Sequence, residues 1–167
     1  MRKRAAAAVL AIVGLCGPEV AAHPLGNFSI SHYAGIEIGA DSIEVKYLLD
    51  FAEIPSVPEL ERVDPDRDDL VTPEEREAYL DAKTEEILPR LSLQVDAEPV
   101  VLKRAWARVS FPPGEGGLST VRVAWSLRGA LADGKDAPSQ FLVWSDRNYE
   151  DQVGWKEIRF LGTDGIG

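Results

Sequence analysis

Apolar and polar residues alternate along much of this chain from Phe28 onward. Between residues 28 and 38 most even-numbered positions are apolar and most odd-numbered positions are polar or small. A two-residue repeat is typical of a β-strand that buries one face. The same repeat returns, separated by turn residues, in the segments 43–49, 91–95, 105–111, 121–127, 141–144 and 155–161. This series of short predicted strands indicates a mostly-β fold, an antiparallel β-sandwich of the immunoglobulin-like kind.

The pattern changes between about residues 54 and 88, where a helical unit is predicted to interrupt the sandwich. Pro55 and Pro58 end the second strand, and residues 58–63 are predicted to form a short helix. Residues 72–88 are predicted to form a second helix, since apolar side chains recur with roughly helical spacing. Its expected apolar face consists of Ala78, Tyr79, Ala82 and Leu88.

The residues that join these two helices fit the twelve-residue calcium loop of an EF-hand. Calcium takes oxygen ligands, and such a loop supplies them from positions 1, 3, 5, 7, 9 and 12. The residues at these positions, all within 64–75, are Asp64, Asp66, Asp68, Leu70 through its backbone carbonyl, Thr72 and Glu75. Position 6 is usually glycine because the chain turns there with φ > 0, but here it is Asp69. We therefore expect a calcium site that is weakened rather than lost.

Part of this stretch also has a simpler interpretation. Thr72, Pro73 and Glu75 are a good helix start, with a capping box between the first and the last of them. A cap alone does not account for three aspartates at every second position before it, because their charges repel one another without a cation. Calcium binding is therefore favoured over a helix cap alone.

The first 22 residues have the features of an export signal. A basic start is followed by a short apolar run and a small-residue cleavage site ending at Ala22. The single cysteine, Cys16, lies in this signal, so the exported domain, 23–167, needs no disulfide. No later segment has the eighteen or so apolar residues that a membrane helix needs. We expect a periplasmic or extracellular domain.

The charge of the chain excludes some classes of partner. The formal net charge is −10 at pH 7, which argues against nucleic acid and anionic membrane surfaces. It suits the binding of cations.

Cleavage after Ala22 would make His23 the new N-terminus, and the only other histidine is His32. A terminal amine and two imidazoles suit Cu²⁺ or Ni²⁺, as in the histidine brace of copper-binding β-sandwiches. Against this, His32 falls on the apolar face of its strand, where a lone histidine is usually a hydrogen-bonded core residue. Both interpretations stay open, the first including a copper-dependent oxidative enzyme.

No sequence pattern of an enzyme stands out, since neither a nucleophile motif nor a glycine-rich phosphate loop is present. Asp50 and Glu53, at the end of the second strand, are interpreted as a solvated rim or a helix start rather than as catalytic carboxylates. We expect a non-enzymatic protein, and a structural module that binds calcium alone is a further alternative.

Several segments, taken in order, resemble the extracytoplasmic N-terminal region of bacterial nickel/cobalt transporter family proteins. They are the opening His23-Pro-Leu-Gly-Asn-Phe28, then His32-Tyr33, Asp50-Phe-Ala-Glu-Ile-Pro55, the aspartate-rich loop, and Gly154-Trp-Lys-Glu-Ile158. In that family the domain precedes transmembrane helices that move the metal. The resemblance implies an exported domain linked to Ni²⁺ or Co²⁺ through His23 and His32, with a membrane transporter as partner or as a missing domain. It does not carry over transport itself, because the sequence reaches Gly167 without such helices.

Overall fold

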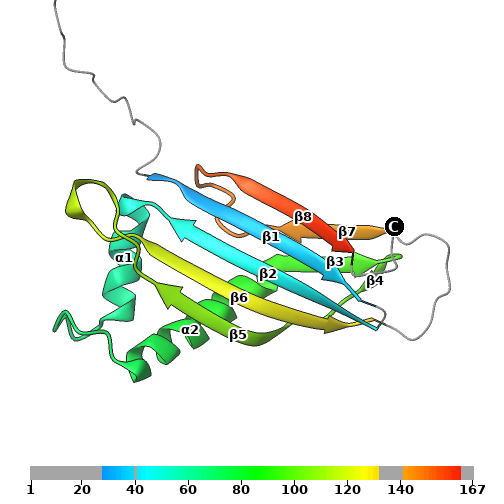
Figure 1. Cartoon of the computed structure of the whole chain (residues 1–167), viewed down its shortest axis with the longest axis horizontal. Helices are drawn as coiled ribbons and strands as arrows, with labels where there is room; N and C mark the ends of the chain where they lie inside the picture. The colour runs from blue at the N-terminus through cyan, green and yellow to red at the C-terminus, as the bar shows by residue number, and fades with distance from the viewer. Residues whose placement is uncertain (1–27, 40, 132–140, 163–167) are drawn as a thin grey trace, which may run out of the picture.

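The computed structural model describes residues 28–39, 41–131 and 141–162 (Figure 1). The predicted signal at 1–22 and His23 lie outside these residues. The described part is mostly β, with two sheets and two α-helices. In chain order its elements are β1 (Ile30–Ile38), β2 (Ser42–Phe51), α1 (Glu53–Val63), α2 (Pro73–Ile87), the 3₁₀ turn η2 (Leu88–Arg90), β3 (Leu91–Val95), β4 (Glu98–Pro99), β5 (Lys103–Ser110), the 3₁₀ turn η3 (Glu115–Gly117), β6 (Val121–Ala130), β7 (Leu142–Asp146) and β8 (Lys156–Gly162).

The strands form a five-stranded sheet in the order β5-β6-β2-β1-β8 and a three-stranded sheet in the order β4-β3-β7. All strand pairs in the described residues are antiparallel except β1 with β8, which is parallel. The expectation of a purely antiparallel sheet is therefore wrong at this edge. After β7 the chain returns to the start of β1, where the Val153 carbonyl accepts a hydrogen bond from the Ile30 N–H (2.8 Å). From there β8 can only run in the same direction as β1.

One face of the five-stranded sheet forms the core, and it is the face that the alternation predicts. Its buried side chains are Ile30, Ala34 and Ile36 of β1, Ile43, Val45, Tyr47, Leu49 and Phe51 of β2, Val109 of β5, and Val121, Val123, Trp125 and Leu127 of β6. Both helices and the small sheet cover this face. The Trp125 indole donates to Thr84 of α2 (2.9 Å), and the ring of Tyr47 lies 6.4 Å from that of Trp144 on β7.

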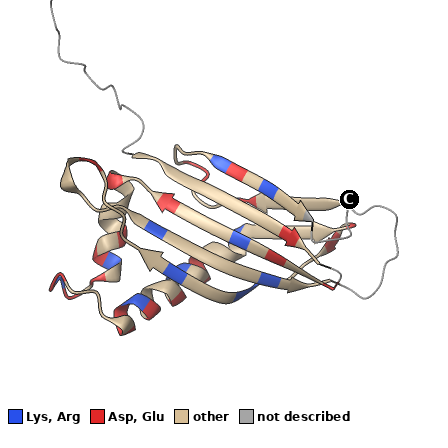
Figure 2. Cartoon of the chain, viewed as in Figure 1, with Lys and Arg blue, Asp and Glu red and all other residues tan. Residues whose placement is uncertain are grey.

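The opposite face of the same sheet is polar and carries ion pairs, and Figure 2 marks the charged positions along its strands. Lys46 pairs with Glu37 across β1 and β2, and Arg122 pairs with Asp50 across β2 and β6. Asp50 is thus part of a surface ion pair, in agreement with its interpretation as a rim residue. Such pairs contribute little stability each, at most about 1 kcal/mol.

The first helix is longer than the sequence suggests. It begins at Glu53 rather than at Pro58. Of Asp50 and Glu53, it is therefore Glu53 that starts the helix. Pro55 lies in the first turn, where a missing N–H leaves no intrahelical bond unmade. Pro58 lies inside the helix, where a proline usually ends or interrupts the helical pattern, so the sequence predicts the start at this residue.

Neither helix of the described residues is both long and apolar enough to cross a membrane.

Candidate metal centre

The aspartate-rich loop lies between the end of α1 and the start of α2. Asp64 is the C-cap residue of α1, and its N–H donates to the Leu60 carbonyl (3.0 Å). Thr72 is the N-cap residue of α2. The loop therefore has both ends fixed by helices, which is the helix–loop–helix order that the sequence predicts.

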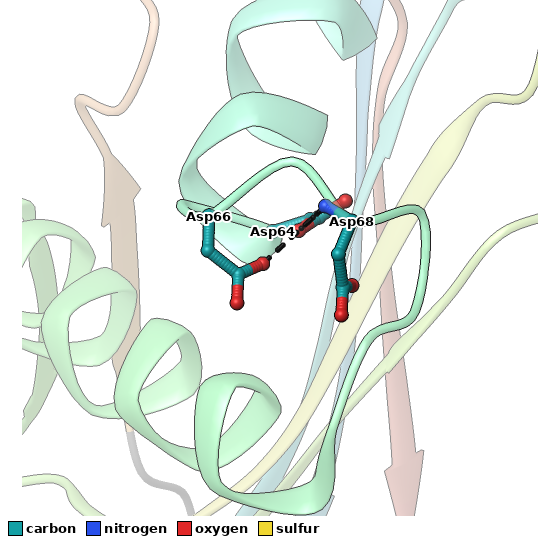
Figure 3. A group of neighbouring side chains, drawn as sticks. All are labelled: Asp64, Asp66 and Asp68. Atoms are coloured by element: carbon teal, nitrogen blue, oxygen red, sulfur yellow. Dashed lines mark hydrogen bonds between the residues drawn. The ribbon is translucent and has the colours of Figure 1, made fainter.

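Three of the predicted ligands come together in this loop. One carboxylate oxygen each from Asp64, Asp66 and Asp68 lies within 4.8 Å of the other two, and the side chains gather inside the turn after α1 (Figure 3). Oxygens that bind one Ca²⁺ at about 2.3–2.6 Å can be at most about 5 Å apart. The spacing of the three carboxylates is thus compatible with a shared calcium ion.

Backbone N–H groups of the loop hold these carboxylates in place. Asp64 accepts from the N–H of Arg67 at 2.9 Å and from that of Asp69 at 3.1 Å. Asp68 accepts from the N–H of Leu70 at 2.8 Å. The chain can wind around Asp64 in this way because Arg67 and Asp69 adopt left-handed conformations, with φ of 60° and 64°. The sharp turn expected at position 6 is present even though the residue is not glycine.

The surroundings of Asp66 alter the acidity of its carboxyl group. A hydrogen bond with Asp64, together with desolvation and the charges of Asp68 and Glu75, raises the pKa of Asp66 above its ordinary value. The ionised form of Asp66 is thus disfavoured in this loop. A bound cation would offset the repulsion between the Asp66 carboxylate and the charges of Asp68 and Glu75.

Glu75, the predicted twelfth ligand, has a different role in this structure. Its carboxylate accepts from the Thr72 N–H (2.8 Å) and the Thr72 hydroxyl (2.7 Å), while Thr72 Oγ1 accepts from the Glu75 N–H (3.2 Å). This is the capping box of the simpler interpretation. The cap and the aspartate cluster are therefore both present, and Glu75 and Thr72 are not part of the group of three. The side chain of Leu70 is exposed.

His32 lies in a separate buried polar group. Its Nδ1 is 2.6 Å from Oδ2 of Asp146, and the hydroxyl of Tyr47 donates to the same carboxylate oxygen at 2.9 Å. His32 is only 5% exposed, which agrees with the interpretation of a hydrogen-bonded core histidine. Its Nδ1 is already engaged, so Nε2 is the ring nitrogen left for a metal.

Asp146 keeps its charge in this setting. Burial alone would raise its pKa, but the hydrogen bonds from His32, the Asn148 N–H and Tyr47 outweigh that effect and lower it. Burial also raises the pKa of the Tyr47 hydroxyl far above its ordinary range. Asp146 is therefore charged, and Tyr47 is a neutral donor to it.

Sequence reasoning missed a second buried group, centred on Lys83 of α2. The Lys83 ammonium is fully buried and donates to Glu59 of α1 (2.8 Å), to Glu86 (3.1 Å) and to the Tyr149 hydroxyl (3.0 Å). Tyr79 donates to the same Glu59 carboxylate at 2.6 Å. The group ties α2 to α1 and to the segment after β7.

A signal for this group exists in the helical spacing. The buried face of α2 consists of Tyr79, Leu80, Lys83, Thr84 and Ile87, which recur every three or four residues. The expected face was wrong at Ala78 and Ala82, which are exposed. A lysine and a threonine occupy the centre of the buried stripe, and a search for apolar residues alone passes over them.

Comparisons of the chain with protein-family models, with curated proteins and with solved structures found no match.

Proposed function

We propose that this chain is an exported, non-enzymatic metal-binding domain whose loop at 64–75 binds Ca²⁺. The observation that supports this most directly is the approach of the Asp64, Asp66 and Asp68 carboxylates to within 4.8 Å. They lie between two helices, in a loop whose backbone turns at Asp69. Carboxylate oxygens are the donors that calcium prefers.

In finer terms, we propose an immunoglobulin-like β-sandwich into which an EF-hand-like unit is inserted at about 54–88. The two sheets and the helix–loop–helix order between β2 and β3 support this. Calcium would neutralise the aspartates and join the end of α1 to the start of α2. Glu75 would complete the site by releasing its cap on Thr72, and the Leu70 carbonyl would add a further oxygen.

The resemblance to nickel/cobalt transporter proteins supports a place for this domain beside a membrane transporter. In this proposal the calcium site is structural, because a single loop lacks the paired partner that sensor EF-hands usually have. The domain would present a fixed surface outside the membrane rather than switch between two shapes.

A second metal site is proposed at His23 and His32 for Ni²⁺, Co²⁺ or Cu²⁺. The observation in its favour is the contact of His32 Nδ1 with Asp146, since metal-bound imidazoles usually give their other nitrogen to such a partner. Calorimetric titration of the mature protein with Ni²⁺ tests it. Binding that is abolished both by His32→Ala and by one extra residue before His23 would support the site, and binding unaffected by either change would refute it.

The test of calcium binding is a thermal melt of the mature protein beginning at His23. A cation that binds only the folded state adds about 2.7 kcal/mol at one hundred times its Kd. We expect Tm to rise in excess calcium relative to chelator. The rise should be lost in Asp64→Ala and reduced in Glu75→Gln.

The matched control for these variants is Glu85→Gln, which removes one negative charge from an exposed position of α2 outside the loop. It should keep the full calcium response. An equal response in Asp64→Ala and in the control would show that calcium acts by general screening of negative charge, and the proposed site would be wrong.

A further inference from the structure

The strand β8 forms one edge of the five-stranded sheet, with β1 as its hydrogen-bonded neighbour in the described residues (Figure 1). The carbonyls of Val153 and Trp155 accept from the N–H groups of Ile30 and His32 at 2.8 and 2.7 Å. Backbone groups of successive residues in a strand point to opposite sides. Odd-numbered residues of β8 therefore bond to β1, while Lys156, Ile158 and Phe160 direct their N–H and C=O groups to the open edge.

Two of the exposed side chains of this strand are large and apolar. Ile158 is 47% exposed and Phe160 is 55% exposed. In the parallel register they lie beside Ala34 and Ile36, both buried, so they belong to the core face of the sheet. An open edge with exposed apolar side chains is a template for a further strand.

The charges of β8 indicate what kind of strand could add to this open edge. Glu157 and Arg159 lie two residues apart on the other face of the strand. In an antiparallel pair centred on Ile158, Glu157 lies opposite the partner's Arg159, and Arg159 lies opposite the partner's Glu157. Ile158 then faces its own copy, and Lys156 faces the partner's Phe160.

The orientation of the backbone groups and the charges both favour this register. A pair centred on Ile158 places two outward-facing backbones opposite each other, as a hydrogen-bonded antiparallel pair requires. Moving the centre by one residue brings Glu157 opposite Glu157, or Arg159 opposite Arg159, and like charges directly opposite each other are destabilising. Charged residues on an edge usually prevent pairing, but here they are complementary to a second copy.

We propose that β8 pairs antiparallel with β8 of a second copy of this chain, so that two five-stranded sheets continue as one across a two-fold axis. Such a contact is isologous, with the same surface contributed by both copies. It does not depend on the calcium loop, which lies between α1 and α2 rather than beside β8.

Sedimentation equilibrium of the mature protein from micromolar to near-millimolar concentration tests the proposal, in chelator and in calcium. We expect a reversible monomer–dimer equilibrium in both. Glu157→Arg and Arg159→Glu should each weaken dimerisation at least tenfold, since each places like charges opposite one another. The double variant with both charges exchanged should restore it.

A cross-linking pair of variants locates the contact. The mature chain contains no cysteine, because Cys16 lies in the signal. Ile158→Cys should form a disulfide-linked dimer under mild oxidation, since residues in a hydrogen-bonded antiparallel pair have Cα atoms about 5.5 Å apart. Phe160→Cys, on the same face and somewhat more exposed, should not, because its copies would lie four residues apart along the strands.

Three results would overturn the proposal. They are a protein that is monomeric at all these concentrations, a dimer that is indifferent to the single charge changes, and a double exchange that fails to restore dimerisation. A monomer that instead binds vesicles would assign this edge to a membrane surface. A calcium response in the melt without dimerisation would leave the proposed function standing.

Discussion

At the scale of single residues, the buried polar group centred on Lys83 contributes to stability rather than to binding. Lys83 is fully buried, and its ammonium faces the aromatic rings of Phe51, Tyr79 and Tyr149 at 5.7 to 5.9 Å as well as the carboxylate of Glu59. Removing one partner of a buried ion pair leaves an uncompensated charge in a low-dielectric setting. We interpret this group as structural, because all three hydrogens of the ammonium have acceptors.

The first prediction concerns Lys83. Lys83→Met should destabilise the fold by about 3 kcal/mol, because the buried Glu59 loses the nearer of its two cationic partners and keeps only Arg62, at 3.4 Å. Urea unfolding at pH 7 measures the change. Adding Glu59→Gln to Lys83→Met removes the carboxylate charge that has lost this partner and should recover part of the loss. A double variant less stable than the single one would contradict a role based on charge pairing.

The second prediction concerns the pH dependence that Asp146 gives to stability. Its pKa is lowered in the folded state from an ordinary value of 3.8. A lowered pKa contributes stability above the unfolded value, and that contribution is lost as pH falls through the folded pKa. Asp146→Asn should therefore lower the free energy of unfolding by about 2 kcal/mol at pH 7, which is typical of a hydrogen bond to a charged group. The gap in unfolding free energy between this variant and the wild type should narrow below pH 3.8.

Urea midpoints of both proteins between pH 7 and pH 3 measure this gap. Asp151→Asn, at an exposed position nearby, is the control and should show no comparable cost at pH 7. A gap for Asp146→Asn that stays constant across the range would show that the carboxylate acts through packing rather than through its charge.

At this scale the sequence indicates the aspartate cluster better than it indicates the buried groups. The loop is local, so twelve consecutive residues bring Asp64, Asp66 and Asp68 together without help from the rest of the fold. The partners of His32 are Tyr47 and Asp146, which are 15 and 114 positions away. Only the strand pairing and the return of β7 bring them together, and a single sequence contains no signal of that.

At the scale of elements, the loop depends on a backbone conformation that its sequence does not favour. Asp69 has φ of 64°, a region that is unfavourable for every residue with a Cβ, although Asn and Asp tolerate it better than most. The third prediction is that Asp69→Gly raises the calcium-free stability by up to about 1 kcal/mol. Calcium affinity should not fall, because the Asp69 carboxylate is outside the cluster of three.

Asp69→Ala is the matched control, since it removes the same charge but keeps a Cβ in the left-handed conformation. It should be less stable than wild type. Equal gains from the alanine and the glycine variants would show that charge, and not backbone strain, limits the loop.

The pairing of β1 with β8 depends on a close approach at Gly154. A Cβ at this position would lie 1.9 Å from the Ile30 carbonyl oxygen, so an alanine forces the two segments apart. The fourth prediction is that Gly154→Ala destabilises the protein by roughly 1–3 kcal/mol, measured by urea unfolding. Gly39→Ala, whose Cβ would meet its nearest atom at 3.2 Å, should cost less. A tolerated Gly154→Ala would show that β8 does not pair with β1 as described.

Elements were predictable where the periodicity is regular and were missed where the backbone departs from it. The alternation in β1, β2 and β6 identifies their buried faces. In β5 the register shifts between Arg104 and Trp106, so Ala105 is exposed and Arg104 turns toward α2, where it pairs with Glu77 and Asp81. An extra residue of this kind changes which face a side chain occupies, and the alternation of 105–111 alone could not show it.

At the scale of the whole molecule, the helix–loop–helix unit is part of the core rather than an appendage. Thr84 accepts a hydrogen bond from the buried Trp125 of β6, and the Ile87 carbonyl accepts one from Asn148 after β7 (3.3 Å). Ser56 of α1 accepts from the Val121 N–H at the start of β6 (2.7 Å). Both helices are therefore joined to the five-stranded sheet by buried contacts, and α2 is also joined to the segment after β7.

The fifth prediction follows from this sharing of one core. If calcium binds the loop, the free energy it adds should stabilise the entire fold, because the helices cannot unfold without exposing Trp125 and its neighbours. Thermal melts followed by far-UV circular dichroism and by tryptophan fluorescence should show a single transition that shifts by the same number of degrees with calcium. In Asp64→Ala neither signal should shift. A calcium shift in the helical signal alone, with the tryptophan signal unchanged, would show that α1 and α2 unfold as a separate unit and that the metal site does not support the sheet.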